Sequence, residues 1–443
     1  MPGVGGGVAP VPPLTILLFL LGFGPFRDPS GSSGMTMDLA KGIKSIEQFS
    51  LEGRRVLIRA DFAVPLTPEG TIQDDSRIHA ALPTIKYAME QGAKVVLAAH
   101  LGKPKGKRVN DLSMLIVGER LQELLTRSLG REVEIFVPDE CVGDGPRKLI
   151  MERLDGEVVL LENLQFHPEE EANDGLFAQR LAALGDVYVN DAFAACHHAY
   201  ASLSAVPRLF VEKGAGLALM KELSVLSRLL SAQVDAPFVV AVGGERFADK
   251  VGFMTNLLGR GRTVLVGGGT AVTLLSAQGL GVGRSKVDAE RIEAARNFLS
   301  RARLRQAEVL LPVDLVVARE VSDEATSETV PSDSVPEDAL ILDIGPKTAL
   351  MFATALGQAR TVFWNGPMGV FERPRFRSGT EAVAKAIARS SGLSVVGGVD
   401  TVAAVARLVL TPFFRHVSLG GPATLMALEG RELPGITALR ETA

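Results

Sequence analysis

Residues 263–269, with the sequence TVLVGGG, join a short apolar run directly to three glycines. The run lacks the alternation of apolar and polar residues that marks a half-exposed strand, so it predicts a strand covered by helices on both faces. Glycine after such a strand permits a tight turn and a close approach of backbone to a ligand. The same combination recurs at Gly243–Gly244, Gly397–Gly398 and Gly420–Gly421. Four such turns indicate a nucleotide site beyond the carboxyl ends of the strands, where helix N-termini offer free N–H groups.

Similar apolar runs lie on both sides of this stretch. The predicted strands are Val56–Asp61, Lys94–Ala99, Val158–Glu162, Val187–Asp191, Phe238–Val242, Thr263–Val266, Val309–Val313, Thr361–Trp364 and Ser394–Val396. Longer helical patterns separate them, and this alternation predicts an α/β fold with parallel sheets and right-handed crossovers. So many strands are better divided between two sheets than placed in one.

Two segments stand out between these elements. Pro207–Gly216 is the predicted joint between the two halves, because a helix with an apolar stripe follows it. The stripe consists of Leu219, Leu223, Leu226 and Leu230. Glu320–Asp338 is rich in Ser, Thr, Asp, Glu and Pro, which predicts an exposed loop.

The composition is that of a globular protein with a large core. The chain has 443 residues, 47% of them hydrophobic, and a formal net charge of -4. No global positive field favours nucleic acid or an anionic membrane, so we expect neither as a partner. The two cysteines, Cys141 and Cys196, lack metal-binding spacing, which indicates a reduced cytoplasmic protein without a zinc site.

The N-terminal residues differ from the rest. Gly and Pro crowd positions 2–13, and the apolar run Leu14–Phe23 is too short to span a membrane. No basic residue precedes that run, as a secretory signal would require. We therefore interpret residues 1–36 as an extension outside the folded core, upstream of a start at Met35 or Met37.

Several longer strings resemble those of phosphoglycerate kinases. The most specific is WNGPMGVFE, residues 364–372. The others are RADFAVP at 59–65, DSRI at 75–78, PTI at 83–85, HLGKP at 100–104, LLENLQFH at 160–167, DAF at 191–193, DK at 249–250 and DT at 400–401. The resemblance runs in order from about Met37 to the C-terminus.

The resemblance implies two doubly wound parallel-sheet domains that face each other across a hinged cleft. It implies an N-terminal domain at 37–213 that holds 3-phosphoglycerate and a C-terminal domain at 214–415 that holds the nucleotide. Residues 416–443 would pack back toward the N-terminal domain. The implied reaction is reversible phosphoryl transfer between 1,3-bisphosphoglycerate and ADP, a step of glycolysis, with Mg²⁺ bound as MgADP or MgATP. We expect a monomer.

On the nucleotide side, the resemblance assigns a carboxylate for the nucleotide's Mg²⁺ to Asp400, a ribose contact to Glu372 and phosphate contacts to Asn365 and Lys250. The full nucleotide-binding set is Gly244, Lys250, Gly267, Gly268, Gly269, Asn365, Pro367, Glu372, Gly398, Val399, Asp400 and Thr401. From the residues alone, Trp364 is expected in the core, and Asp400 would also suit a helix N-cap.

On the substrate side, the resemblance assigns hydroxyl and carboxylate contacts to Asp61 and His100 and a transition-state contact to Arg77. The full substrate-binding set is Asp61, Ala63, Arg77, His100, Lys103, Gln165 and His198. The implied catalytic set is Arg77, Arg246, Lys250, Gly398 and Gly421.

Several of these positions depart from the family's pattern. Lys103, Gln165 and His198 replace arginines that grip the 3-phosphate, Arg246 replaces a lysine, and Ala63 and Tyr200 replace an asparagine and a histidine. Two lost charge-assisted bonds would weaken phosphoglycerate binding by roughly a hundredfold to ten-thousandfold.

The turns expected to hold the transferred phosphoryl group depart as well. Leu419 and Pro422 offer fewer donors than the family's STGGGA string. Val399, at a glycine position of the family, is poorly suited to a positive φ.

Two alternatives therefore stay open beside a phosphoglycerate kinase with a divergent site. One is a nucleotide-binding pseudoenzyme on the same fold, because the departures spare the nucleotide pocket. The other is an acyl-phosphate kinase for a different small acid, because Gln165 and His198 would suit a neutral polar group.

Overall fold

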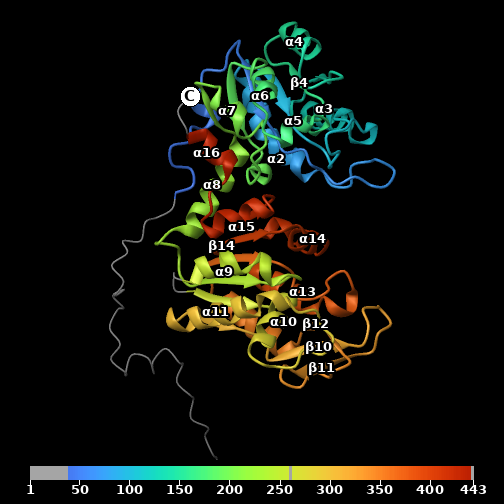
Figure 1. The fold of residues 1–443 in the computed structure, drawn as a ribbon, viewed down its shortest axis with the longest axis vertical. Helices are drawn as coiled ribbons and strands as arrows, with labels where there is room; N and C mark the ends of the chain where they lie inside the picture. The colour runs from blue at the N-terminus through green and yellow to red at the C-terminus, as the bar shows by residue number, and fades with distance from the viewer. Residues whose placement is uncertain (1–37, 259–261, 441–443) are drawn as a thin grey trace, which may run out of the picture. The chain divides into compact units, whose positions relative to one another are not determined.

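A computed structural model describes residues 38–258 and 262–440 (Figure 1). The interpretation of residues 1–36 falls outside these ranges. Within them, no helix has both the length and the apolar character needed to cross a membrane.

The first sheet has six parallel strands in the order β3-β4-β2-β1-β5-β6. Its strands are β1 Arg55–Arg59, β2 Lys94–Ala98, β3 Ile135–Phe136, β4 Val158–Leu160, β5 Val187–Asn190 and β6 Lys213–Ala215. The helices of this half are α2 Ser76–Glu90, α3 Leu115–Leu129, α4 Asp144–Met151, α5 Pro168–Glu171, α6 Gly175–Ala182, α7 Ala205–Arg208 and α8 Leu217–Leu230.

The second sheet also has six parallel strands, in the order β15-β14-β13-β7-β8-β9. Its strands are β7 Phe238–Val242, β8 Arg262–Val266, β9 Glu308–Leu310, β13 Thr361–Asn365, β14 Leu393–Gly397 and β15 His416–Ser418. The helices of this half are α9 Val251–Leu257, α10 Gly268–Ala277, α11 Ile292–Leu304, α12 Pro346–Gly357, α13 Ser378–Ala388, α14 Val399–Arg407 and α15 Pro422–Glu429.

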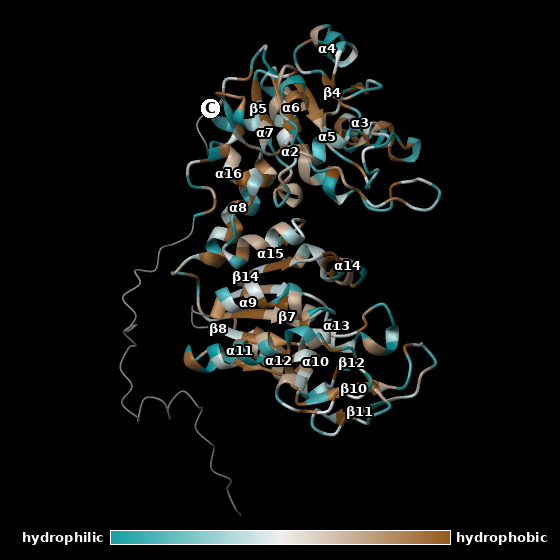
Figure 2. Ribbon diagram, in the orientation of Figure 1, coloured by the Kyte–Doolittle hydropathy of each residue, from teal (hydrophilic) through white to brown (hydrophobic). Residues whose placement is uncertain are grey.

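The predicted α/β fold with two parallel sheets is confirmed. In Figure 2 the central strands of both sheets are brown, whereas helices such as α11 carry teal residues. β7 is buried along its whole length, as its unbroken apolar run predicts. Each of the nine predicted strands is present. The largest difference is at 309–313, where β9 ends at Leu310, two residues before Pro312, which has no N–H to donate to a neighbouring strand.

A third sheet corrects the prediction of a loop at Glu320–Asp338. This sheet is antiparallel, in the order β11-β10-β12, with β10 Asp314–Ala318, β11 Ser327–Pro331 and β12 Leu340–Ile344. β11 lies inside the polar stretch and carries no fully buried residue. Its pairing with β10 rests on backbone hydrogen bonds, which a polar sequence does not reveal.

α8 connects the two halves. Leu219, Leu223, Leu226 and Leu230 are all fully buried, which confirms the predicted apolar stripe. The helix packs against α2 of the first half and α15 of the second. The last helix, α16 (Pro434–Arg440), contacts α7 and β6, so the end of the described chain lies against the first half (Figure 1).

Candidate functional site

The glycine turns beyond the second sheet pack against one another. Gly366 has φ +96°, and a Cβ there would lie 2.2 Å from the carbonyl atoms of Gly243. A Cβ on Gly268 would lie 2.8 Å from the amide nitrogen of Gly244. The turns after β7, β8 and β13 therefore need glycine for their own packing, before any ligand is considered.

These turns form one wall of a cavity of about 420 Å³. Six of the predicted nucleotide-binding residues line it: Gly244, Gly268, Gly269, Pro367, Glu372 and Asp400. The opposite wall includes Leu342 and Asp343 at the end of β12, so the unpredicted antiparallel sheet contributes to the cavity. Leu315 and Val272 add apolar surface suited to a flat aromatic ring.

Asp343 is a buried carboxyl in that wall, and the sequence reasoning missed it. It accepts hydrogen bonds from the N–H of Gly379 at 2.7 Å and of Ile344 at 2.9 Å. Burial raises its pKa from 3.8 to about 7 against the effect of these two donors.

Lys250 points into the turn after β13. Its Nζ donates to the side-chain oxygen of Asn365, whose amide nitrogen donates to the Gly397 carbonyl at 2.8 Å. Burial lowers the pKa of Lys250, while Asp249 and Asp400 partly offset this shift. Gly397 belongs to β14, so these contacts link the ends of β13 and β14 to a cation.

The start of α14 differs from two expectations. The helix begins at Val399 with Gly398 as its N-cap, so the proposed N-cap role of Asp400 is wrong. Asp400 is instead an exposed residue of the first turn. The positive φ, 92°, falls on Gly398, and Val399 is helical and 73% exposed, so the expected strain at Val399 is absent. Thr401 is buried and accepts a hydrogen bond from the Gly366 N–H at 2.6 Å.

The remaining residues of this side support the turns in different ways. Trp364 is fully buried, as predicted, and its Nε1 donates to the Gly366 carbonyl at 2.9 Å. A Cβ on Gly267 would lie 2.5 Å from the sulfur of Met368. The Arg246 side chain is 61% exposed and lies 3.8 Å from the Asp249 carboxylate.

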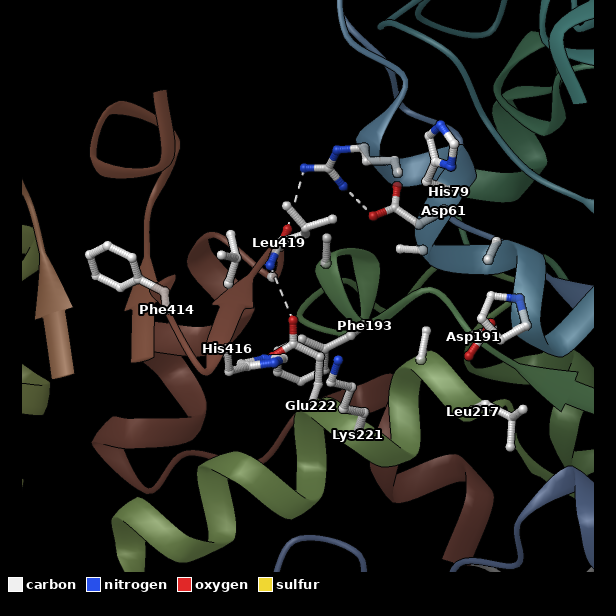
Figure 3. Close-up of a pocket in the computed structure, with 18 of the residues that line it drawn as sticks. Asp61, His79, Asp191, Phe193, Leu217, Lys221, Glu222, Phe414, His416 and Leu419 are labelled. Atoms are coloured by element: carbon white, nitrogen blue, oxygen red, sulfur yellow. Dashed lines mark hydrogen bonds and ion pairs between the residues drawn. The ribbon is translucent and has the colours of Figure 1, made fainter. Parts of the chain in front are cut away.

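A second cavity, of about 520 Å³, lies between α2, α8 and the segment around β15 (Figure 3). Arg77 forms an ion pair with Asp61 and donates to the Leu419 carbonyl at 3.4 Å. The Leu419 N–H in turn donates to Glu222 at 3.1 Å. Leu419 therefore lies between Arg77 on α2 and Glu222 on α8, as Figure 3 shows.

Glu222 and His416 form a buried pair that the sequence reasoning missed. His416 Nε2 lies 3.0 Å from Glu222 Oε2, and the side chains are 5% and 10% exposed. Glu222 follows Leu219 by three positions and precedes Leu226 by four, so it shares the buried face of α8 with the leucine stripe. This helical spacing was the signal in the sequence, because a carboxylate on a buried face needs a partner.

The turn after β15 leads into α15. Gly421 is its N-cap with φ 53°, and Pro422 is the first helical residue, where its missing N–H costs little. Ser418 and Thr424 share a buried hydroxyl hydrogen bond of 2.7 Å.

His100 lies outside both cavities, beside the strand ends of the first sheet. Its Nδ1 is 3.0 Å from Nη2 of Arg59, a fully buried residue. Burial and the positive charges of Arg59 and Arg77 hold the pKa of His100 well below 6.5. His198 and Lys103 lower the same pKa by smaller amounts, so both of these predicted residues lie near His100.

The rings of His197, His198 and Tyr200 are in contact: the first two are tilted by 41°, and the last two are stacked. The ring centroids of His197 and His198 are 3.8 Å apart, and those of His198 and Tyr200 are 4.5 Å apart at an angle of 10°. Burial lowers the pKa of His198, with smaller effects from His197 and Lys103. A neutral ring stack thus occupies the place where an arginine was expected.

Gln165 is buried beside this stack, at 3% exposure. It lies within hydrogen-bonding reach of the Tyr200 hydroxyl, and its Oε1 has no partner among the described residues. Ala63 donates its N–H to Asp61 at 3.4 Å and contributes no polar side chain.

Comparison with known proteins agrees with this arrangement. The family described as phosphoglycerate kinase matches residues 46–431. The phosphoglycerate kinase of Anaeromyxobacter dehalogenans is 46% identical over 90% of this chain and 100% of its own length. That of Pelotomaculum thermopropionicum is 45% identical over 89% of this chain and 98% of its own.

Two solved structures share the fold. The phosphoglycerate kinase of Coxiella burnetii has a TM-score of 0.79 and 37% identity, and it covers 90% of this chain and 98% of its own. That of Pyrococcus horikoshii OT3 has a TM-score of 0.76 and 32% identity, and it covers 89% of this chain and 98% of its own. With the family match over residues 46–431, the shared fold and nearly the whole length in common, this chain belongs to the phosphoglycerate kinase family.

Proposed function

We propose that the chain catalyses reversible phosphoryl transfer between 1,3-bisphosphoglycerate and ADP. The observation that carries this proposal is the contact of Arg77 with both Asp61 and the Leu419 carbonyl. Asp61 follows the end of β1, and Leu419 follows β15, so one guanidinium touches the carboxyl ends of both parallel sheets. A reaction between a small acid and a nucleotide requires the two bound molecules to be close together, and a cation in contact with both sheet ends can reach both.

The cavity of about 420 Å³ would hold the nucleotide. Its apolar wall suits adenine, Glu372 would contact the ribose, and Lys250 and Asn365 would contact the phosphates. Gly267, Gly268 and Gly269 would line the adenine pocket. Thr401 would hold the first turn of α14 beside the phosphates, and Val399 would be part of that turn through its backbone.

The donor chemistry fits Mg²⁺ that is carried by the nucleotide. Asp400 supplies an exposed carboxylate at the cavity, and residues 38–258 and 262–440 contain no group of three or more His, Cys, Asp or Glu that could hold a metal. Mg²⁺ in kinases is bound through one or two carboxylates together with substrate phosphates. The ion would neutralise phosphate charge there.

Asp61, His100 and Arg77 would hold the carboxylate and hydroxyl end of phosphoglycerate, and Lys103 would contact its phosphate. Gln165, His198 and Ala63 would contribute polar or van der Waals contacts without full charge. Arg77, Arg246 and Lys250 would stabilise the transferred group, because phosphoryl transfer depends on positioning and charge. Gly398 and Gly421 would bring the N-termini of α14 and α15 close to it.

A coupled assay with ADP and 1,3-bisphosphoglycerate tests the proposal on residues 37–443. We expect turnover that falls by about a hundredfold or more in Asp400→Ala, because a single carboxylate holds the ion on the protein side. Wild-type turnover equal to that of the variant would reject the proposal. MgADP binding without turnover would favour a pseudoenzyme, and turnover only with other carboxylic acids would favour a different substrate.

We also infer a cytoplasmic monomer. The thiols of Cys141 and Cys196 are buried and unpaired, which suits a reducing compartment. All proposed site residues come from one chain, so the reaction requires no second copy.

A further inference from the structure

Arg59 ends strand β1 with its whole side chain buried. Its guanidinium makes three hydrogen bonds in different directions. Nε donates to the Ser202 hydroxyl at 2.8 Å, Nη1 donates to the Ala60 carbonyl at 2.5 Å, and Nη2 meets Nδ1 of His100 at 3.0 Å. A buried guanidinium held at three points has little freedom to move.

The contact with Arg59 determines the tautomer of His100. A guanidinium has donors and no acceptor, so Nδ1 of His100 must accept this hydrogen bond. A neutral imidazole with an unprotonated Nδ1 carries its proton on Nε2. Nε2 is on the far side of the ring from Arg59, and His100 keeps part of its surface exposed. The ring therefore presents a fixed N–H donor on the side away from the core.

Ser202 and Glu170 hold Arg59 in turn. The Ser202 hydroxyl accepts from Arg59 and donates to Glu170 Oε1 at 2.5 Å, while the Ser202 N–H donates to Glu170 Oε2 at 2.9 Å. Glu170 is fully buried on α5, and both of its carboxylate oxygens are occupied by Ser202. These contacts form a chain of hydrogen bonds from Glu170 through Ser202 and Arg59 to His100.

We propose that Arg59, held by Ser202 and Glu170, is a positioning residue that fixes His100 as a neutral Nε2–H donor to the phosphoglycerate. This rests on the proposed function. Burial and the charges of Arg59, Arg77 and Lys103 keep the pKa of His100 low, so the ring stays neutral at pH 7. A fixed neutral donor gains importance here because Gln165 and His198 do not supply the charge of two arginines.

The first test reads the tautomer directly. Two-dimensional NMR of ¹⁵N-histidine-labelled protein distinguishes a protonated Nε2 from a protonated Nδ1. We expect the Nε2–H form alone in the wild type between pH 6 and 8, and a mixture of both tautomers in Ser202→Ala and Arg59→Lys. A protonated Nδ1 in the wild type would overturn the proposal. This readout needs no turnover, so it separates the inference from the proposed function.

The second test is kinetic, with 3-phosphoglycerate and ATP as substrates. Ser202→Ala is expected to raise KM for 3-phosphoglycerate by about tenfold, with kcat and KM for ATP nearly unchanged, because the hydrogen bond that His100 donates is loosened in both the bound substrate and the transition state. Ser204→Ala is the matched control, since Ser204 is also buried but contacts Arg208 instead. Equal effects of the two serine variants would contradict the proposal.

A double variant completes the test. If Ser202 acts through His100, then Ser202→Ala should raise KM no further in a His100→Ala background, because the donor that it positions is gone. Additive effects would show a separate, merely structural role for the buried chain. If Arg59→Lys does not fold, Ser202→Ala and the double variant still decide the question.

Discussion

The region beyond the second sheet is formed mainly by backbone, whereas the region beyond the first sheet is formed mainly by side chains. Beyond the second sheet, the turns after β7, β8 and β13 contact one another through backbone, and glycine is required at Gly243, Gly268 and Gly366 by their mutual packing. Beyond the first sheet, the site consists of side chains such as Gln165 and His198. Substitution in the first kind of region disrupts the fold, whereas substitution in the second changes mainly the ligand. The departures from the family at Ala63, Lys103, Gln165 and His198 all lie in the second kind of region.

The largest effect should come from a methyl group in the backbone-built region. Gly366→Ala forces a side chain into φ +96° and places Cβ 2.2 Å from Gly243. We expect a loss of about 4 kcal/mol in the free energy of unfolding, from backbone strain and overpacking together. Fluorescence of Trp364, the single tryptophan, would follow denaturant unfolding of this half.

Gly357→Ala is the matched control for that variant. Gly357 ends α12, and a Cβ there meets no other atom within 4 Å. Alanine should stabilise this helix by up to about 1 kcal/mol. A similar loss in both variants would refute the claim that packing between the turns sets the need for glycine.

A second prediction concerns the buried carboxyl of the same region. The pKa of Asp343 is about 7 in the folded protein against a usual 3.8. The folded state therefore binds this proton more tightly than the unfolded chain, so its contribution to stability is lost as pH rises from about 4 to about 7. A difference of about 3 pKa units corresponds to at most about 4 kcal/mol.

Comparison with Asp343→Asn isolates this contribution. The variant is less stable overall, because its single oxygen cannot accept from both Gly379 and Ile344. Its stability should nevertheless depend less on pH between 5 and 7, as measured by urea unfolding at each pH. Parallel curves for the two proteins would show that Asp343 does not titrate in this range.

The same contrast explains what could be predicted from sequence. Nine of the twelve strands of the two parallel sheets were predicted, because strands such as β7 are unbroken apolar runs. β3, β6 and β15 were not predicted, because each has only two or three residues. β11 was missed because its residues are mostly exposed and pair only through backbone. Arg59 lay inside a motif, but its partner Ser202 is 143 positions away, and no local pattern encodes that contact.

For the candidate site, residues within sequence motifs could be predicted, whereas residues that reach the site through tertiary contacts could not. The resemblance identified Gly268, Pro367 and Asp400, which line the cavity of about 420 Å³ beyond the second sheet. It could not indicate Asp343, which reaches the cavity from the antiparallel sheet. Nor could it reveal the stacked rings of His198 and Tyr200, because stacking depends on side-chain orientation and not on spacing.

A third prediction sharpens the comparison from the substrate side. Gln165→Arg removes an Oε1 that has no partner among the described residues and adds a charge beside Lys103 and His198. One added charge-assisted bond should tighten 3-phosphoglycerate binding by about tenfold to a hundredfold, measured by calorimetry. Because Gln165 is buried and within hydrogen-bonding reach of Tyr200, the longer side chain must displace its neighbours, and we expect a loss of about 1–3 kcal/mol in the free energy of unfolding.

Gln179→Arg controls for the added charge itself, because Gln179 is exposed on α6. It should change the affinity by no more than about twofold, since screened surface charges act weakly. Equal gains from both variants would indicate general attraction of the anion. No gain from Gln165→Arg would place the phosphate elsewhere.

The smallest effect on stability and affinity is expected for Val399→Gly. Val399 occupies a glycine position of the family, but it lies in the first turn of α14 with helical backbone, and Gly398 supplies the positive φ. Val399→Gly should therefore lower stability by only about 0.5 kcal/mol, the difference in helix propensity. MgADP affinity should change by less than about threefold, since the exposed valine makes no contact that the turn requires. A gain of tenfold or more in MgADP affinity or kcat would mean that the restricted backbone of residue 399 limits nucleotide binding. The contrast between a region formed by backbone turns and a region formed by side chains would then not hold for the turn after β14.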